Sequence, residues 1–87
     1  MVGIVLINRS ENGYLNINIR TNEGVARVRS SRKLFNPDWT DIKRCTRMKV
    51  TKMVQDRKRK NLYWITIGSK IRSCLPKVPC QANKLWE

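Results

Sequence analysis

The residues from Tyr14 to Thr21 alternate between polar and apolar side chains, and this pattern constrains the fold more than any other feature of the chain. One side of the alternation holds Leu15, Ile17 and Ile19. A period of two is that of a β-strand with one face buried and one face in water. The stretch therefore predicts a half-buried strand, whose outer face carries Tyr14 in line with two amide side chains, Asn16 and Asn18.

Two shorter runs of strand-forming residues flank this stretch. Residues 2–7 are apolar and rich in β-branched side chains, and residues 25–29 alternate again. Asn12-Gly13 and Asn22-Glu23-Gly24 separate the three runs, and both are typical turn sequences. The first third of the chain therefore predicts a three-stranded antiparallel meander, with Arg20, Arg27 and Arg29 on its exposed face.

The second half of the chain predicts a hairpin. Residues 48–55 and 62–67 are rich in strand formers and surround a polar stretch, residues 56–61. Lys52 interrupts the apolar face of the first run, so we expect that run near a sheet edge, with Lys52 pointing inward as a guard against aggregation. The sequence leaves open whether residues 70–75 form a short sixth strand.

A helix entry signal stands between the meander and the hairpin. Asn36 suits the N-cap, Pro37 the first helical position and Asp38 the first turn. We expect a short helix over residues 37–44, with Trp39, Ile42 and Cys45 facing inward.

Together these elements predict a mainly β fold. It is a small antiparallel barrel or sheet of five to six strands, OB-like or SH3-like, with one short helix between strands 3 and 4. Residues 1–80 form a single basic domain, and residues 81–87 form a C-terminal tail.

Positive charge is the second constraint. The 87 residues include 19 Lys and Arg against 6 Asp and Glu, a net charge of +13, and 13 of the 19 cations lie between residues 27 and 60. So large a surplus on a small body opposes folding by self-repulsion, and a polyanionic partner commonly compensates it. The charge therefore favours a nucleic acid as the partner.

Histidine is absent, and the three cysteines are Cys45, Cys74 and Cys80. Three thiols cannot complete a four-ligand zinc site, and the usual general base at neutral pH is missing. The chain also has no glycine-rich phosphate loop and no nucleophile elbow. We therefore expect no enzyme, no metal and no cofactor.

The apolar runs, the N-terminal residues and the cysteines indicate the cellular compartment. The longest apolar run, residues 4–7, is too short to cross a bilayer, and the first residues do not resemble a signal peptide. We expect an intracellular, cytoplasmic protein (within a host cell if it is viral) that binds no membrane. Its thiols are expected to be reduced, with Cys45 as a small core hydrophobe; a disulfide between Cys74 and Cys80 is the alternative.

Basic and aromatic residues supply the candidate binding site. The hairpin tip carries four consecutive cations, Arg57, Lys58, Arg59 and Lys60, which cannot all be buried. Tyr63 shares the more apolar face of its strand, so Trp64 is expected outside, where it could stack on a base; Tyr14 is a second stacking candidate. The other candidates for phosphate contact are Arg27, Arg29, Arg32, Lys33, Arg44 and Lys49.

These observations lead to two functional hypotheses. The first is a small basic protein that contacts the phosphate backbone of RNA or single-stranded DNA with little sequence specificity. The alternative is an inhibitor or assembly protein of the phage or viral type that binds an acidic surface of a host protein. The sequence also leaves open whether the expected edge strand pairs with a second copy to form a homodimer.

Overall fold

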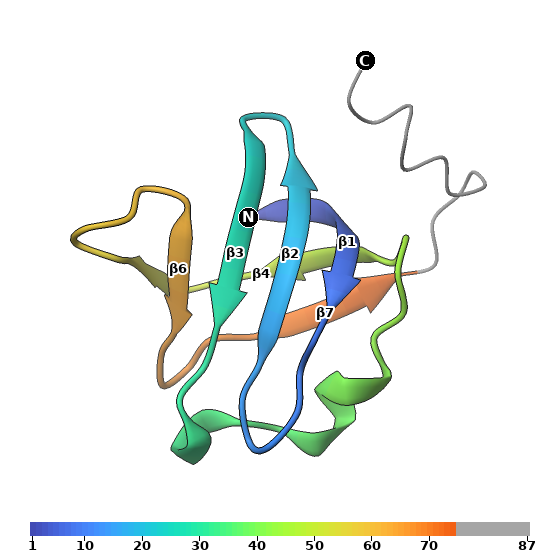
Figure 1. Ribbon diagram of the computed structural model, residues 1–87, viewed down its shortest axis with the longest axis vertical. Coiled ribbons are helices and arrows are strands. Elements are labelled where there is room, and N and C mark those ends of the chain that lie inside the picture. Colours follow the sequence, from blue (N-terminus) through green and yellow to red (C-terminus); the bar gives the residue numbers. More distant parts are fainter. Residues whose placement is uncertain (75–87) are drawn as a thin grey trace.

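The computed structural model describes residues 1–74, and its main feature is a seven-stranded mixed sheet that curls into a half-barrel (Figure 1). Four strands, in the order β6-β3-β2-β1, lie side by side, with β4 and β7 crossing behind them. The full order is β5-β6-β3-β2-β1-β4-β7. The strands are β1 (Val2–Asn8), β2 (Asn16–Thr21), β3 (Gly24–Arg29), β4 (Arg47–Val50), β5 (Met53–Gln55), β6 (Leu62–Ile65) and β7 (Ile71–Cys74).

The expected mainly β fold is confirmed, and so is the antiparallel meander of β1, β2 and β3. The turn between β1 and β2 follows the Asn-Gly signal. Asn12 and Gly13 both have positive φ, 52° and 81°, and Glu11 and Tyr14 exchange two backbone hydrogen bonds across the turn. Two successive residues of positive φ give the type I′ turn, whose twist matches that of the flanking strands.

Strand number and sheet type differ from the prediction. The sheet has seven strands rather than five or six, and it is mixed because β3 pairs with β6 in parallel. The single strand expected over residues 48–55 is divided into β4 and β5 at Lys52, which has φ 55°. Its carbonyl oxygen accepts hydrogen bonds from the hydroxyls of Thr66 and Ser69, which hold the bend.

One expectation about this segment is wrong, and another holds for only part of it. Lys52 is exposed rather than inward-pointing, because the left-handed bend turns it out of the pleat. The second part of the run, β5, lies at the edge of the sheet as expected, whereas the first part, β4, lies between β1 and β7. Only Thr51 and Lys52 separate β4 from β5, so one extended segment pairs with β1 through its first part and with β6 through its second.

The helix expected over residues 37–44 is present only as a 3₁₀ turn, η2 (Pro37–Asp41), and another 3₁₀ turn, η1 (Arg32–Leu34), precedes it. Asn36 caps η2 as predicted, since its side chain accepts a hydrogen bond from the Asp38 amide at 3.0 Å. The helix does not continue because the Asn8 side chain donates to the carbonyls of Trp39 and Ile42, at 2.8 and 2.9 Å. The Trp39 carbonyl thus accepts the Asn8 amide in addition to the Ile42 N–H, and the Ile42 carbonyl accepts the Asn8 amide beyond the end of η2.

The core lies inside the half-barrel, and the inward residues of the strands fill it. The members of the main cluster are Val5, Leu15, Ile17, Ile19, Ala26, Val28, Met48, Val50 and Ile65. Trp39 and Ile42 pack against this cluster as expected, and the Trp39 ring meets Phe35 edge-on with ring centroids 5.8 Å apart. The 3₁₀ turns thus cover one open end of the core (Figure 1).

Cys45 departs from its expected state. It is disulfide-bonded rather than a reduced core thiol, and it has φ 74° at the entry to β4. A disulfide constrains the unfolded chain as well as the folded one. The expected alternative, a bridge between Cys74 and Cys80, lies outside the residues whose side chains are described, and so does the tail at residues 81–87.

Ser30 joins the end of β3 to the start of β2, and its substitution tests this junction. Ser30 is 1 % exposed, and its hydroxyl accepts a hydrogen bond from the Leu15 amide at 3.0 Å. We predict that Ser30→Ala lowers the free energy of unfolding by about 1–3 kcal/mol, because it leaves a buried amide without a partner.

The control is Ser31→Ala at the exposed neighbouring position, which we expect to change stability by no more than about 0.5 kcal/mol. Urea unfolding of the three proteins measures both effects. Equal stability of the two variants would contradict the prediction.

Candidate nucleic-acid interface

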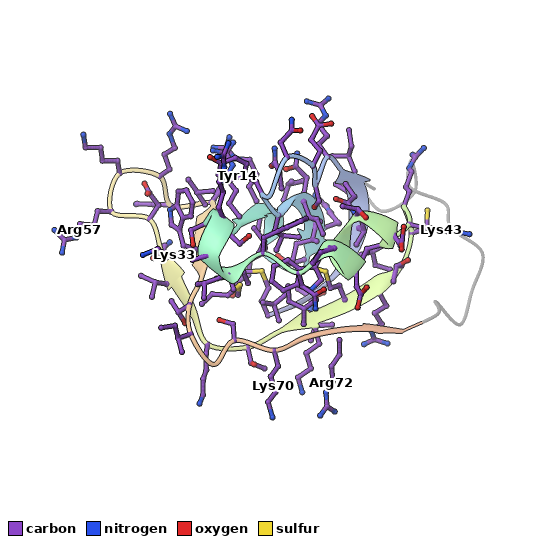
Figure 2. All side chains as sticks on the ribbon, turned by 90° about the horizontal axis from the view of Figure 1, so that it is seen from below. Tyr14, Lys33, Lys43, Arg57, Lys70 and Arg72 are labelled. Atoms are coloured by element: carbon purple, nitrogen blue, oxygen red, sulfur yellow. The ribbon has the colours of Figure 1, made fainter. Side chains whose placement is uncertain are left out.

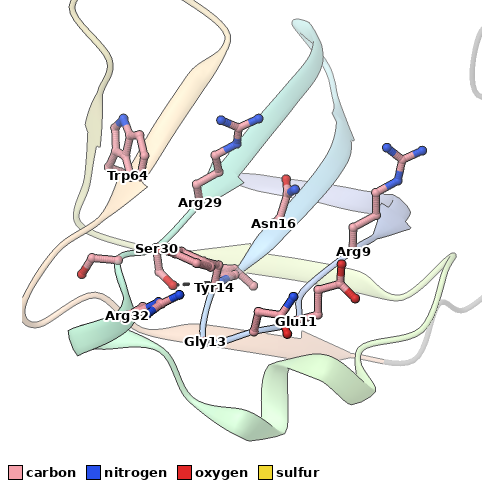
Figure 3. A pocket seen from close by; sticks show the side chains of 12 residues that line it. Arg9, Glu11, Gly13, Tyr14, Asn16, Arg29, Ser30, Arg32 and Trp64 are labelled. Carbon is pink, nitrogen blue, oxygen red and sulfur yellow. Dashed lines mark hydrogen bonds between the residues drawn. The ribbon is translucent and has the colours of Figure 1, made fainter.

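An open hollow of about 1250 Å³ lies on the outer surface of the sheet (Figure 3). Three separate segments line it: the β1–β2 connection, the end of β3 with the residues after it, and β6. We call this hollow the groove; its lining residues are Arg9, Glu11, Asn12, Gly13, Tyr14, Leu15, Asn16, Arg29, Ser30, Ser31, Arg32 and Trp64.

Strand register explains why side chains from distant parts of the sequence meet there. Arg29 pairs with Asn16 on β2 and with Trp64 on β6, and residues paired across strands project from the same face. Arg9 continues this row, because its amide donates to the Asn16 carbonyl at 2.8 Å. An aromatic ring, two guanidinium groups and an amide are thus spaced about one strand apart, at about 4.8 Å per strand.

Trp64 presents its ring to the groove while its polar edge is held. The side chain is 36 % exposed, and the indole N–H donates to the Asp56 carboxylate at 3.1 Å. Tyr63 lies on the opposite face and packs against the core, so the predicted orientation of the two rings is confirmed. Because the only donor of the indole is occupied, the ring face is what a ligand can use.

Asp56 also organises the basic tip, defined as residues 57–60 between β5 and β6. Its carboxylate accepts hydrogen bonds from the backbone amides of Lys58 and Arg59, both at 3.0 Å. The Trp64 hydrogen bond, these amides and the charge of Arg59 hold the pKa of Asp56 below its usual value of 3.8. One carboxylate therefore fixes both the aromatic side chain and the base of the cationic loop.

Arg29 lies in the middle of the row and carries an unused hydrogen-bond donor. Its Nε atom is buried and has no hydrogen-bond partner within the described part of the chain. A buried donor without an acceptor is unfavourable.

A second aromatic residue, Tyr14, lies at the lower side of the groove in Figure 3. It is 44 % exposed, and the Arg32 guanidinium carbon lies 5.1 Å from its ring centroid, a cation–π contact. Gly13 packs beside the Arg32 side chain, and its φ of 81° is the backbone conformation that favours glycine at this position.

The groove cations form no close ion pairs with carboxylates in the described part of the chain. Within residues 1–74, setting Arg20 aside, no Lys or Arg nitrogen lies within 4.0 Å of a carboxylate oxygen. Glu11 is the one acidic residue that lines the groove. The positive charge is therefore available to an anion from outside.

The groove gathers four of the residues proposed from the sequence: Tyr14, Arg29, Arg32 and Trp64. The tip residues Arg57, Lys58, Arg59 and Lys60 adjoin it through the Asp56–Trp64 hydrogen bond. Arg27 shares the outer face of β3 with Arg29, and Lys33 follows Arg32 in η1. Arg44 and Lys49 are not among the lining residues; Lys49 projects from β4, beside β7.

Sequence reasoning missed three participants. Arg9 belongs to a stretch without net charge, and Ser30 fell in a stretch without a clear pattern. Asp56 was visible only as one acid before four cations. The available signal was its position at the start of a polar loop, where a carboxylate can accept hydrogen bonds from the amides that follow.

No protein-family model matches the sequence, and no curated protein is significantly similar to it. None of the helical segments within residues 1–74 has the length and apolar character needed to span a bilayer.

The link between Asp56 and Trp64 predicts a pH dependence. A carboxylate with a lowered pKa stabilises the folded state fully above pH 3.8, and this contribution is lost as the pH falls through its folded-state pKa. We predict that wild type is more stable than Asp56→Asn near neutral pH and that the difference shrinks in acid. Urea unfolding at a series of pH values measures it.

The Trp64→Phe background is the control for this experiment. It removes the indole N–H, which is the largest cause of the lowered pKa. In that background, we expect Asp56→Asn to change stability less and with a weaker pH dependence. The same pH profile in both backgrounds would contradict the assigned hydrogen bond.

Proposed function

We propose that the protein binds single-stranded nucleic acid, RNA or DNA, in the groove, through backbone phosphates and base stacking and with little sequence preference. The observation that carries the proposal is the row of Trp64, Arg29 and Arg9 across neighbouring strands. An exposed ring stacks on any unpaired base, and guanidinium groups beside it bind phosphates. This pairing of groups is what a ligand of alternating bases and phosphates requires.

The topology supports the proposal, and we propose that the half-barrel is OB-like rather than SH3-like. The meander β1–β2–β3, the parallel addition of β6 and the segment β4–β5 that pairs with both β6 and β1 fit a five-stranded Greek-key barrel. OB-folds bind oligonucleotides on the face of strands 2 and 3 and with the loops that join strands 1–2 and 4–5. In this numbering those parts are β2–β3, the β1–β2 connection and the basic tip.

Stacking on Trp64 favours an unpaired strand over a duplex. A base inside a duplex shows only its edges in the grooves, whereas an unpaired base offers its whole face. The tip residues, Arg57 to Lys60, are all exposed and would contact phosphates beyond the ring. Phosphate contacts carry little sequence information, which is why we propose weak sequence preference.

One observation keeps the acidic surface of a protein as the second candidate partner. Val54 is 56 % exposed and pairs in register with Trp64, so the groove continues into an apolar patch. Aromatic and arginine side chains next to apolar ones are also typical of the centre of a protein interface. A partner protein that remains bound after nuclease treatment, with no oligonucleotide binding, would favour this candidate.

The first test of the proposal removes the ring. We predict that Trp64→Ala weakens the binding of a pyrimidine oligonucleotide by about 1–3 kcal/mol, the contribution of one stacked base. Fluorescence anisotropy at fixed salt measures the affinity. The control is Ile67→Ala, which removes an apolar side chain that is 89 % exposed and lies outside the groove. Equal affinity of both variants would contradict the proposal.

The second test concerns the basic tip. We predict that Lys58→Gln reduces the slope of log affinity against log salt by about 0.7, the value for one phosphate contact on a single strand, for all base sequences alike. The matched control is Lys43→Gln, which removes the same charge. Figure 2 shows Lys43 and Arg57 at opposite sides of the molecule, so the control residue lies far from the tip. A wild-type slope in Lys58→Gln would count against tip contacts.

A further inference from the structure

A second group of cations lies on the outer face of β4 and β7. Lys49 of β4 pairs directly with Arg72 of β7. One step along the strands, Thr51 and Lys70 exchange hydrogen bonds, with the Thr51 amide donating to the Lys70 carbonyl and the Lys70 amide to the Thr51 hydroxyl. These four residues line a shallow hollow of about 230 Å³, and we call this surface the β7 face.

Like charges directly opposite each other in a sheet are destabilising. Lys49 and Arg72 are both exposed, and neither lies within 4.0 Å of a carboxylate among residues 1–74. The acids of that part of the chain belong to other segments: the turns on either side of β2, the η2 turn and the start of the tip. Within residues 1–74, no acidic side chain relieves the repulsion on the β7 face, and an external anion could do so.

The composition of the β7 face indicates the chemistry of that anion. It offers ammonium and guanidinium groups with one hydroxyl, and its lining includes no aromatic ring. Such a surface can bind phosphates but offers nothing on which bases can stack. Lys70 directly precedes β7 and Arg72 lies within it, two residues further on, which in extended chain is about 6.6 Å and comparable to the separation of successive phosphates in an extended nucleic-acid strand.

The β7 face is separate from the groove. Its four lining residues and those of the groove share no member. Figure 2 shows Lys70 and Arg72 projecting from the β7 side of the molecule, away from the side on which Tyr14 lies. One strand in the groove would therefore leave the β7 face open.

We propose that the β7 face is a second phosphate-binding surface, so that one molecule of the protein holds two segments of nucleic acid at once. The inference rests on the proposed function for the segment in the groove. The segment on the β7 face is held by its backbone alone, so it is bound more weakly than the segment in the groove. Added salt therefore removes a larger share of its binding free energy.

The test uses the full chain and two pyrimidine oligonucleotides of about 10 nucleotides, within the site size of one OB-fold. One oligonucleotide carries a donor dye and the other an acceptor. We expect wild type to bind two oligonucleotides per molecule and to give energy transfer between the dyes. We expect Lys49→Gln/Lys70→Gln to bind one and to lose the transfer, with a salt slope for total binding lower by about 1.4, since each contact contributes about 0.7.

Two controls accompany the experiment. Lys43→Glu changes the net charge by the same two units at a site away from both surfaces, and we expect it to keep two-segment binding. Sedimentation establishes the mass of the free protein, and we expect a monomer. A wild type that binds one oligonucleotide, or a Lys49→Gln/Lys70→Gln variant that still binds two, overturns the inference. A wild-type dimer that this variant dissociates also overturns it, because the face would then join two copies.

A groove variant, Arg29→Gln/Trp64→Ala, separates this inference from the proposed function. If the groove variant binds one oligonucleotide and the Lys49→Gln/Lys70→Gln variant binds two, the groove proposal stands and the β7 face falls. If the groove variant still binds two and the Lys49→Gln/Lys70→Gln variant binds one, the β7 face stands and the assigned groove falls. A wild type that binds no oligonucleotide overturns both.

Discussion

Parallel pairing between β3 and β6 is the contact on which the groove depends. The strands are separated by more than 30 residues, yet the Arg27 amide donates to the Asn61 carbonyl at 2.7 Å, and Arg29 comes into register with Trp64. Without that register, the cation and the ring would belong to unrelated parts of the surface. The pairing also brings the basic tip to the end of the row, because the tip leads directly into β6. One set of backbone hydrogen bonds thus brings together residues whose proximity could not be predicted from the sequence.

Charge and core act against each other in this protein. A net charge of +13 opposes compaction, while the apolar cluster on the concave side of the sheet, with Leu15, Ile17 and Ile19 fully buried, favours it. In β2 and β4, the strand period of two keeps them apart: the buried inward residues are aliphatic or Met48, whereas the outward residues are cationic or amide. Asp56 is the exception, since its carboxylate lies among cations and accepts hydrogen bonds that shape the tip. The remaining positive charge faces solvent, where a phosphate chain would reduce the repulsion.

Local patterns predicted local structure well. The alternation in residues 14–21, the Asn12-Gly13 turn, the Asn36 cap and the outward position of Trp64 all follow from neighbouring residues, and all are observed. Features set by distant partners escaped prediction. The parallel β3–β6 pairing, the bend at Lys52 and the shortening of the helix by Asn8 each require a residue far away in sequence. The candidate site behaves in the same way: its aromatic and basic members were visible, but their assembly into a row, and the participation of Arg9 and Asp56, depend on strand register.

The bent segment that contains β4 and β5 runs from the β7 face to the groove and contributes backbone pairing to both. Its first half carries Lys49 on the β7 face, and its second half pairs with the strand that carries Trp64. A slip of one residue would put Arg47 and Lys49 in the inward places of Met48 and Val50 and would shift both ends together. The hydroxyls of Thr66 and Ser69 donate hydrogen bonds to the Lys52 carbonyl and so hold the bend between the two surfaces. The chain therefore changes sheet neighbours at a bend held by hydrogen bonds, with only Thr51 and Lys52 between the part that carries Lys49 and the part that pairs with β6.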